Sequence, residues 1–370
     1  MVNGGRCAAL MPDEACLLSQ DALQQQRRYI RRRADLLRSA TMRKLFLMAA
    51  FSLFLGCGSS SLSSPGSSNS TDGGSGDDAS SPGDSFSIED ELPATEWPTA
   101  PEMLGGERPA KYVLPKQYTA DEQWPLLLLL HGYSANIGNP ELSGGDIQDG
   151  YLGLSQRSSE LGFIMLIPHG TLDSKNNQFW NATDYCCDFE KNGVDDVTYL
   201  TGLLDEAATY FNVDPKRVYL LGHSNGGFMS YRLACAAGER FAALASIAGT
   251  SYWDATKCTP ASSPISVLQI HGTADTSIKY DGITGAFCSA DEVVQRWVQR
   301  NACEGNGEAG TALDIVSGDN AAETNVTRWS QCADDTVVEL WSMDGIGHIP
   351  GFTSDFSAAA LDFLLSKKRP

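Results

Sequence analysis

Residues 217–227 read "RVYLLGHSNGG", an apolar run followed by a serine between two glycines. Gly222, Ser224 and Gly226 form the G-x-S-x-G pattern of a nucleophile elbow, a sharp strand-to-helix turn that presents a serine hydroxyl. The glycines leave room for the turn, and the amino end of the following helix favours negative charge. The pattern is short and recurs by chance. Its surroundings must decide whether Ser224 is a nucleophile or a small residue in a turn.

The rest of the chain from about residue 95 alternates apolar runs with amphipathic stretches. The apolar runs have strand length and are continuous, which suits strands covered on both faces; they are 124–132, 163–170, 217–224, 241–249, 265–272 and 336–343. Helical patterns lie at 195–211, 226–238, 289–301 and 354–365. Strands that alternate with helices predict an α/β fold, a mostly parallel central sheet flanked by helices, in a single domain.

A serine is a poor nucleophile unless a base takes its proton and a carboxylate orients that base. After Ser224, "IHGTADTSI" places Asp275 in the loop that follows one apolar run, and "SMDGIGHIPG" places His348 in the loop that follows the last one. The carboxyl ends of parallel strands form the usual ligand site, and the order Ser, Asp, His is common behind this elbow. We therefore predict a Ser224-His348-Asp275 triad, with Asp281 and Asp291 as alternative acids.

The other histidines, His131, His169, His223 and His271, each end or abut an apolar run, which favours packed or supporting roles.

An acyl intermediate also needs donors for its oxyanion. The backbone N–H of Asn225, next after the serine, is one candidate, and the N–H of Tyr133 in "HGY" is the other. The alternative is that Gly132, the glycine of "HGY", only ends a strand. In "FWNATDYCCDF", Trp180 and Tyr185 either line an acyl or sugar pocket, and so bind substrate, or pack beneath the loop.

Several motifs together resemble a known family: "HGYSAN", "IPHG", "FWNATDYCC", "VDDVTYL", "LGHSNGGFMSYRLAC", "LQIHGTADTSIKYDG" and "GIGHIPG". They look like the secreted esterases that group polyhydroxybutyrate depolymerase-like proteins with feruloyl and acetylxylan esterases. The likeness covers about residues 110 to 366. It implies an α/β-hydrolase fold and hydrolysis of carboxylic esters, with Ser224, Asp275 and His348 at the family's triad positions. Because no binding module follows the last helical pattern, we expect esters of plant polysaccharide fragments or short oligoesters.

Seven cysteines follow residue 57, namely Cys186, Cys187, Cys235, Cys258, Cys288, Cys303 and Cys332. Because no C-x-x-C pair or histidine cluster indicates a metal site, we expect no metal or cofactor, and disulfides are the better interpretation. The placement of the cysteines relative to the expected elements predicts two pairs, Cys235 with Cys258 and Cys303 with Cys332. Cys186 and Cys187 either bond to each other or leave one to reach Cys288.

The N-terminal part reads as an export segment. Residues 42–57 have a basic start, an apolar stretch too short to span a bilayer, and Gly56-Cys57, which resembles a lipoprotein cleavage site. The alternative is ordinary signal cleavage further along. Residues 1–41 are then a non-native or disordered extension with translation starting at Met42, and 58–94 are a flexible Ser/Gly/Asp-rich linker before a catalytic domain at 95–370.

The net charge of −19 disfavours binding to nucleic acid or to anionic membranes, so we expect a small or polymeric ester as partner. Membrane contact is expected only through the lipid anchor at Cys57. The expected location of the protein is the cell surface, the periplasm or the space outside the cell. Two rival functions are a serine peptidase of the prolyl-oligopeptidase type and a non-catalytic binding lipoprotein. The first usually carries a propeller with internal repeats, which this sequence lacks, and the second would be expected to lose a triad residue.

If the chain is exported as a lipoprotein, the mature protein should begin at Cys57. Mass spectrometry of the native protein should find no peptide before Cys57, and Cys57 should carry a lipid. An unmodified N-terminus within 58–94 would rule out lipidation and leave ordinary signal cleavage.

Overall fold

The computed structural model describes residues 97–258, 263–318 and 322–370. The predicted extension, signal segment, Cys57 and linker, residues 1–94, lie outside the described residues. Among the residues that are described, no helix is long and apolar enough to cross a membrane.

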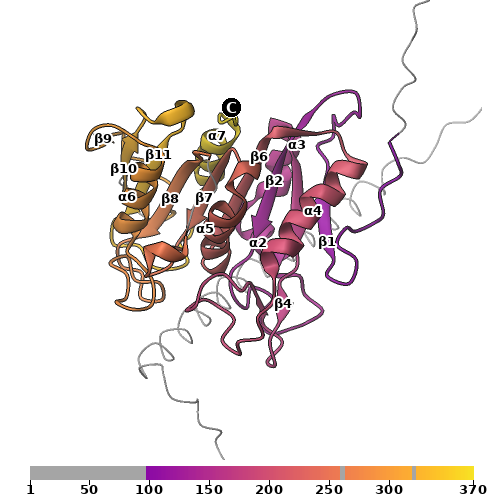
Figure 1. The fold of residues 1–370 in the computed structure, drawn as a ribbon, viewed down its shortest axis with the longest axis horizontal. Coiled ribbons are helices and arrows are strands. Elements are labelled where there is room, and N and C mark those ends of the chain that lie inside the picture. Colours follow the sequence, from indigo (N-terminus) through magenta and orange to yellow (C-terminus); the bar gives the residue numbers. More distant parts are fainter. Residues whose placement is uncertain (1–96, 259–262, 319–321) are drawn as a thin grey trace, which may run out of the picture. The chain divides into compact units, whose positions relative to one another are not determined.

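A nine-stranded sheet forms the centre of the fold (Figure 1), in the order β1-β3-β2-β6-β7-β8-β11-β10-β9. Neighbouring strands from β3 to β11 pair in parallel, whereas β1, β10 and β9 add antiparallel edges. The strands are β1 (Ala110–Val113), β2 (Trp124–Leu130), β3 (Ile164–Pro168), β6 (Val213–His223), β7 (Ala243–Ile247), β8 (Ser266–Gly272), β9 (Glu308–Ala309), β10 (Thr324–Trp329) and β11 (Val338–Met343). A separate hairpin pairs β4 (Thr171–Leu172) with β5 (Gln178–Phe179). The predicted fold class, a mostly parallel sheet flanked by helices, is confirmed.

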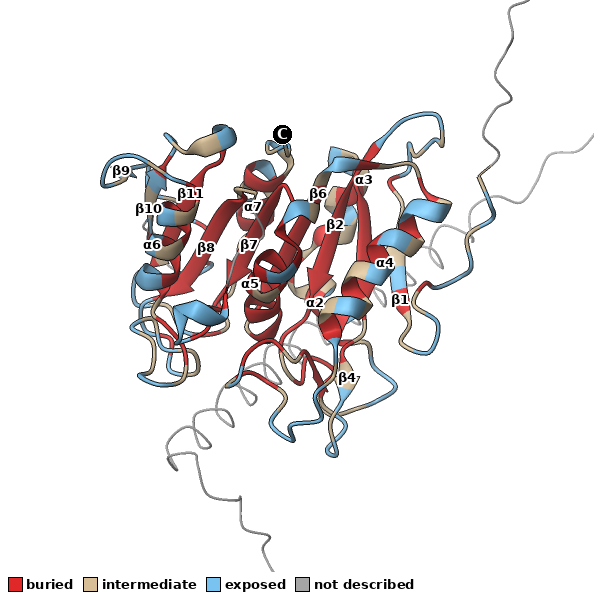
Figure 2. Cartoon of the chain, viewed as in Figure 1, coloured by how far each residue is buried: buried red, intermediate tan, exposed pale blue. Residues whose placement is uncertain are grey.

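Helices cover both faces of this sheet, which explains why its apolar runs are continuous (Figure 2). In β2, Leu126, Leu128 and Leu130 pack into one hydrophobic cluster, with residues of α4, α5 and α6. The alternate residues Leu127 and Leu129 pack into a second cluster, with residues of α3 and α7. The helices are α2 (Gly144–Leu152), α3 (Leu154–Leu161), α4 (Asp196–Tyr210), α5 (Asn225–Ala237), α6 (Ala290–Arg300) and α7 (Ser354–Leu365), with short 3-10 turns η1 (Gly238–Arg240), η2 (Ala255–Lys257) and η3 (Ala333–Asp335).

Several helices begin at a polar side chain that accepts a hydrogen bond from a backbone N–H of the first turn. Asp195 accepts from Thr198 before α4, Ser289 from Glu292 before α6, and Thr353 from Asp355 before α7. Such caps satisfy N–H groups that lack a partner within the helix. The helix that carries the candidate nucleophile is different, because Ser224 occupies the cap position of α5 without a side-chain capping bond.

Three disulfides are present in the described part of the chain. Cys235 bonds to Cys258 and Cys303 to Cys332, which are the two predicted pairs, and Cys186 bonds to its neighbour Cys187. Of the two arrangements left open for the Cys-Cys pair, the structure therefore has the vicinal one. Cys288 is a free, buried thiol.

The Cys303–Cys332 disulfide should contribute measurably to stability. It closes a sequence separation of 29 residues between the end of α6 and η3, and loop-closure entropy gives about 3 to 4 kcal/mol for a loop of this length. The double variant Cys303→Ser/Cys332→Ser should lower the free energy of unfolding by that amount in chemical denaturation. Reduction should destabilise the wild type at least as much as the variant, because it also opens the other two disulfides. A loss below about 1 kcal/mol would contradict this.

Candidate active site

Ser224 lies in the turn between β6 and α5, with backbone angles φ 56° and ψ −118°. A positive φ is unfavourable for a residue with a side chain and costs about 1–3 kcal/mol. The turn is tight because its glycines touch backbone. A Cβ on Gly226 would lie 2.1 Å from the Leu130 carbonyl oxygen, and one on Gly222 would lie 2.1 Å from the Gly226 carbonyl oxygen. This is the local geometry that the G-x-S-x-G pattern predicts.

A hydrogen-bonded chain joins the three predicted triad residues, which come from the carboxyl ends of β6, β8 and β11. The Ser224 Oγ lies 2.9 Å from His348 Nε2, and His348 Nδ1 lies 2.7 Å from Asp275 Oδ2. An ionised carboxylate can only accept hydrogen bonds, so Nδ1 carries the proton. Nε2 is then free to accept the proton of the serine hydroxyl. This is the arrangement of a serine nucleophile with a general base.

Asp275 is 4% exposed and is surrounded by donors. Its Oδ1 accepts the backbone N–H groups of Ser277 and Ile278, at 2.8 and 2.9 Å. Its Oδ2 lies 3.3 Å from His271 Nε2 in addition to its bond with His348. Burial by itself raises the pKa of the Asp275 carboxyl, but the two imidazoles and their hydrogen bonds together hold that pKa well below its ordinary value. Asp275 therefore stays ionised.

The structure does not bring the alternative acids to the histidine. Asp281 and Asp291 are both exposed, and Asp291 accepts a 3.4 Å hydrogen bond from the Tyr280 hydroxyl. The carboxylate that contacts His348 is that of Asp275.

Two further histidines support the site without contacting the serine hydroxyl. His223 Nε2 lies 3.0 Å from the His348 carbonyl oxygen and so helps to hold the loop that carries His348. His131 bonds through Nδ1 to the Gly132 carbonyl and through Nε2 to the Gly170 N–H. Because Nε2 accepts a hydrogen bond there, the neutral ring fits its site and the charged ring does not. Burial lowers the pKa of His131 to about 4 and that of His223 to about 3.

The predicted oxyanion donors lie on segments that meet beside Ser224. A Cβ on Gly132 would lie 3.5 Å from the Ser224 Cβ, so the loop after β2 passes next to the serine. Within the described residues, neither the N–H of Tyr133 nor that of Asn225 donates a hydrogen bond. Both are free to serve a ligand. The Tyr133 hydroxyl donates to Asp173 at 2.6 Å, which fixes the ring.

Trp180 and Tyr185 have different surroundings. Trp180 is completely buried, which matches packing beneath the loop rather than a pocket lining, so the substrate-binding interpretation of Trp180 finds no support in its burial. Tyr185 is partly exposed and packs against Phe287, with ring centroids 5.2 Å apart. The exposed part of Tyr185 is accessible to a substrate.

Sequence reasoning missed the role of the Asn225 side chain. Its amide accepts from the Trp180 N–H and donates to the Trp180 carbonyl, at 2.7 and 2.9 Å. It also missed the second imidazole at Asp275, although His271 stands four residues before that carboxylate in "IHGTADTSI". The His-Gly dipeptide at the end of an apolar run was the available signal, but it does not say what the histidine contacts.

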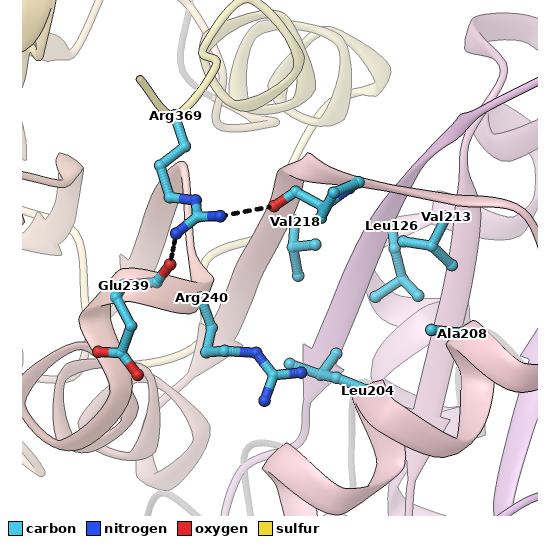
Figure 3. A pocket seen from close by; sticks show the side chains of 9 residues that line it. Leu126, Leu204, Ala208, Val213, Val218, Glu239, Arg240 and Arg369 are labelled. Carbon is cyan, nitrogen blue, oxygen red and sulfur yellow. Dashed lines mark hydrogen bonds between the residues drawn. The ribbon is translucent and has the colours of Figure 1, made fainter.

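A cavity of about 200 Å³ lies elsewhere, where β2 and β6 face α4 and η1 (Figure 3). Arg369 lines it and donates to the carbonyl oxygens of Glu239 and Pro215. The remaining lining residues are Leu126, Leu204, Ala208, Val213, Val218 and Arg240. Val213 and Val218 precede His223 on β6 by five residues or more, so this cavity is separate from the triad at the strand's carboxyl end.

The buried histidines should make stability depend on pH. Near pH 6.5 the unfolded chain protonates His131 and His223, whereas in the folded chain their pKa values of about 4 and 3 keep them neutral. The free energy of unfolding should therefore fall as the pH drops from about 7 to about 4, by up to about 1.4 kcal/mol per pH unit for each histidine. Denaturation of the wild type and of His223→Gln at a series of pH values isolates the contribution of one histidine. The free energy of unfolding should depend less steeply on pH in the variant, because the variant takes up about one proton fewer on unfolding. Equal slopes would contradict the assignment.

Comparisons with known proteins point to hydrolases. A family model described as the prolyl oligopeptidase family matches residues 154–286, about a third of the chain. Feruloyl esterase B of Piromyces equi is 28% identical over 64% of this chain and 42% of that protein. The bifunctional acetylxylan esterase/xylanase XynS20E of Neocallimastix patriciarum is 25% identical over 61% of this chain and 29% of that protein.

Among solved structures, an acetyl xylan esterase from Aspergillus awamori is similar, with 14% identity, a TM-score of 0.49, and coverage of 69% of this chain and 93% of that one. The chain spans less than half the length of the two curated relatives named above. The resemblance to feruloyl and acetylxylan esterases that the motifs implied is confirmed. The mostly parallel sheet, with Ser224, Asp275 and His348 in that chain order at its strand ends, has the arrangement of an α/β-hydrolase fold. The likeness to polyhydroxybutyrate depolymerases stays a prediction.

Proposed function

We propose that this protein is an exported serine esterase that hydrolyses carboxylic esters attached to plant polysaccharides. The supporting observation is the hydrogen-bonded chain from Ser224 through His348 to the buried, ionised Asp275. The names of the curated relatives, feruloyl and acetylxylan esterases, supply the substrate class. Disulfides favour an oxidising compartment outside the cytoplasm.

The proposed reaction uses only groups of this chain. Ser224 Oγ attacks the ester carbonyl while His348 Nε2 takes the hydroxyl proton, and the backbone N–H groups of Tyr133 and Asn225 bind the oxygen that becomes negative. The imidazolium, stabilised by Asp275, then protonates the leaving alcohol, and an acyl-enzyme remains. Water, activated by the same histidine, attacks the acyl carbonyl and releases the acid together with free Ser224.

An aromatic surface beside a proposed oxyanion donor supports a hydroxycinnamoyl acyl group. The ring of Tyr133 packs edge to face with that of Phe189, with centroids 5.2 Å apart. Phe189 is 48% exposed, although large apolar side chains are usually buried. Glu190, next to Phe189, accepts hydrogen bonds from Ser174, so the loop is fixed to the hairpin that also holds Tyr133. We therefore expect methyl ferulate to be a better substrate than a simple acetate ester.

The match to the prolyl oligopeptidase family favours one alternative, a serine peptidase. That activity would use the same triad, so the triad cannot separate the two. The wild type should be assayed on methyl ferulate, acetylated xylan, 3-hydroxybutyrate oligomers and a chromogenic proline peptide. Ester hydrolysis without peptide hydrolysis supports the proposal, and the reverse result replaces it. If the wild type acts on none of them and a fluorophosphonate probe does not label Ser224, a binding protein becomes the better interpretation.

The exposed residue Asp281 provides a matched control for Asp275, the proposed acid of the triad. Asp275→Asn should keep the fold but lower kcat by about 10⁴-fold, because the histidine loses the carboxylate that sets its tautomer and stabilises its charged form. Asp281→Asn, at the exposed alternative acid, should stay close to the wild type, and Ser224→Ala should abolish both turnover and probe labelling. The assignment fails if Asp275→Asn keeps most of the activity on the best ester.

A further inference from the structure

We propose that Trp180 is a positioning residue that sets the separation of the two oxyanion donors, the N–H groups of Tyr133 and Asn225. The inference rests on the proposed function, since it concerns the oxyanion site of that reaction. Trp180 contacts no reacting atom in this proposal. It acts by bonding to both of the segments that carry the donors.

The first link runs to the helix that starts at the nucleophile. The Trp180 N–H donates to Asn225 Oδ1 at 2.7 Å, and Asn225 Nδ2 donates to the Trp180 carbonyl at 2.9 Å. Both residues are completely buried. An amide that accepts from and donates to the same residue has a defined orientation, and in the low-dielectric interior an unmade bond is costly. The peptide of residue 225 is thereby tied to Trp180.

The second link runs to the loop after β2. The Trp180 indole N–H donates to the His131 carbonyl at 2.9 Å, and the two rings lie with centroids 4.7 Å apart. His131 directly precedes Gly132 and Tyr133. One side chain therefore holds the backbone two residues before the second donor.

The two donor segments also touch each other directly. A Cβ on Gly226 would lie 2.1 Å from the Leu130 carbonyl oxygen and 2.8 Å from that of His131. This contact sets how closely the segments can approach. Trp180 bonds to both of them, so it limits how far they can move apart or slide.

Trp180 is itself held by groups outside the donor segments. The next residue, Asn181, donates its N–H to Asp196 at 2.6 Å, and Asp196 pairs with Arg108 at 2.7 Å. The Cys187 N–H donates to the Trp180 carbonyl at 3.2 Å, from the vicinal disulfide turn. The position of Trp180 is therefore fixed by the protein without help from a bound substrate.

A positioning role for Trp180 predicts a loss of kcat with little change in KM. Oxyanion donors act on the charge that develops in the transition state, and a misplacement of about 1 Å can lower the rate about 100-fold. Trp180→Phe keeps a ring but removes the indole N–H. We expect kcat on the best ester to fall about 10- to 100-fold with KM within about twofold of the wild type. Affinity for a trifluoromethyl ketone, which mimics the tetrahedral intermediate, should fall by a similar factor.

Trp124 provides the matched control. It begins β2, the same strand that ends before His131, and its indole N–H donates to the Thr119 carbonyl at 2.8 Å. Trp124→Phe removes the same kind of bond at the far end of the strand. It should change the melting temperature about as much as Trp180→Phe, while kcat and ketone affinity stay at wild-type values.

A second variant guards against misfolding. Asn225→Asp keeps the acceptor for the Trp180 N–H but loses the donor to its carbonyl, and it too should lower kcat more than it changes KM. The proposal is overturned if Trp180→Phe matches Trp124→Phe in kcat, or if only KM rises, which would indicate substrate contact. It is also overturned if Trp180→Phe fails to fold and Asn225→Asp retains wild-type kcat. A wild type without activity on any ester would instead defeat the proposed function itself.

Discussion

The close backbone contact between α5 and the end of β2 is the constraint on which the site depends. Gly226 meets the Leu130 carbonyl at a distance that admits no side chain, and the turn before it holds Ser224 at φ 56°. The strain at Ser224 is balanced by a 2.7 Å bond from its N–H to the Ile247 carbonyl, at the end of the neighbouring strand β7. The strands on either side of β6, β2 and β7, therefore fix the turn. The Ser224 hydroxyl lies at the carboxyl ends of the strands, next to His348.

Burial on both sheet faces then sets the electrostatics. Asp275, His131 and His223 are all buried at the carboxyl ends of strands, and burying a charge is costly unless that charge is paired and hydrogen-bonded. Asp275 meets this need with two backbone donors and two imidazoles, and it remains ionised in spite of its burial. His131 and His223 meet it in the opposite way, by remaining neutral in fixed hydrogen bonds. One low-dielectric layer thus holds a charged acid and uncharged histidines together.

Much of this architecture follows from the sequence, because burial on two faces leaves continuous apolar runs. Each such run became a strand, and the four helical patterns became α4, α5, α6 and α7 within a residue or two. The antiparallel strands β1, β9 and β10 escaped notice because they are at most partly buried and their sequences mix polar and apolar residues. α2 was missed because "GGDIQDGYL" contains three glycines and two aspartates, which are poor helix formers, and α3 because "LSQRSSEL" is short and has only two apolar residues.

The aromatic residues near the site show where the sequence stops being informative. In the printed sequence Trp180 and Tyr185 look alike, but Trp180 is buried because partners 45 and 49 residues away, Asn225 and His131, satisfy all its polar groups. Tyr185 and Phe189 keep exposed surface on the same segment. In the proposed mechanism this segment has two layers, of which the inner one fixes the backbone donors and the outer one meets the substrate. In such an arrangement the outer aromatic residues can vary with the ester while the inner bonds that serve the chemistry stay unchanged.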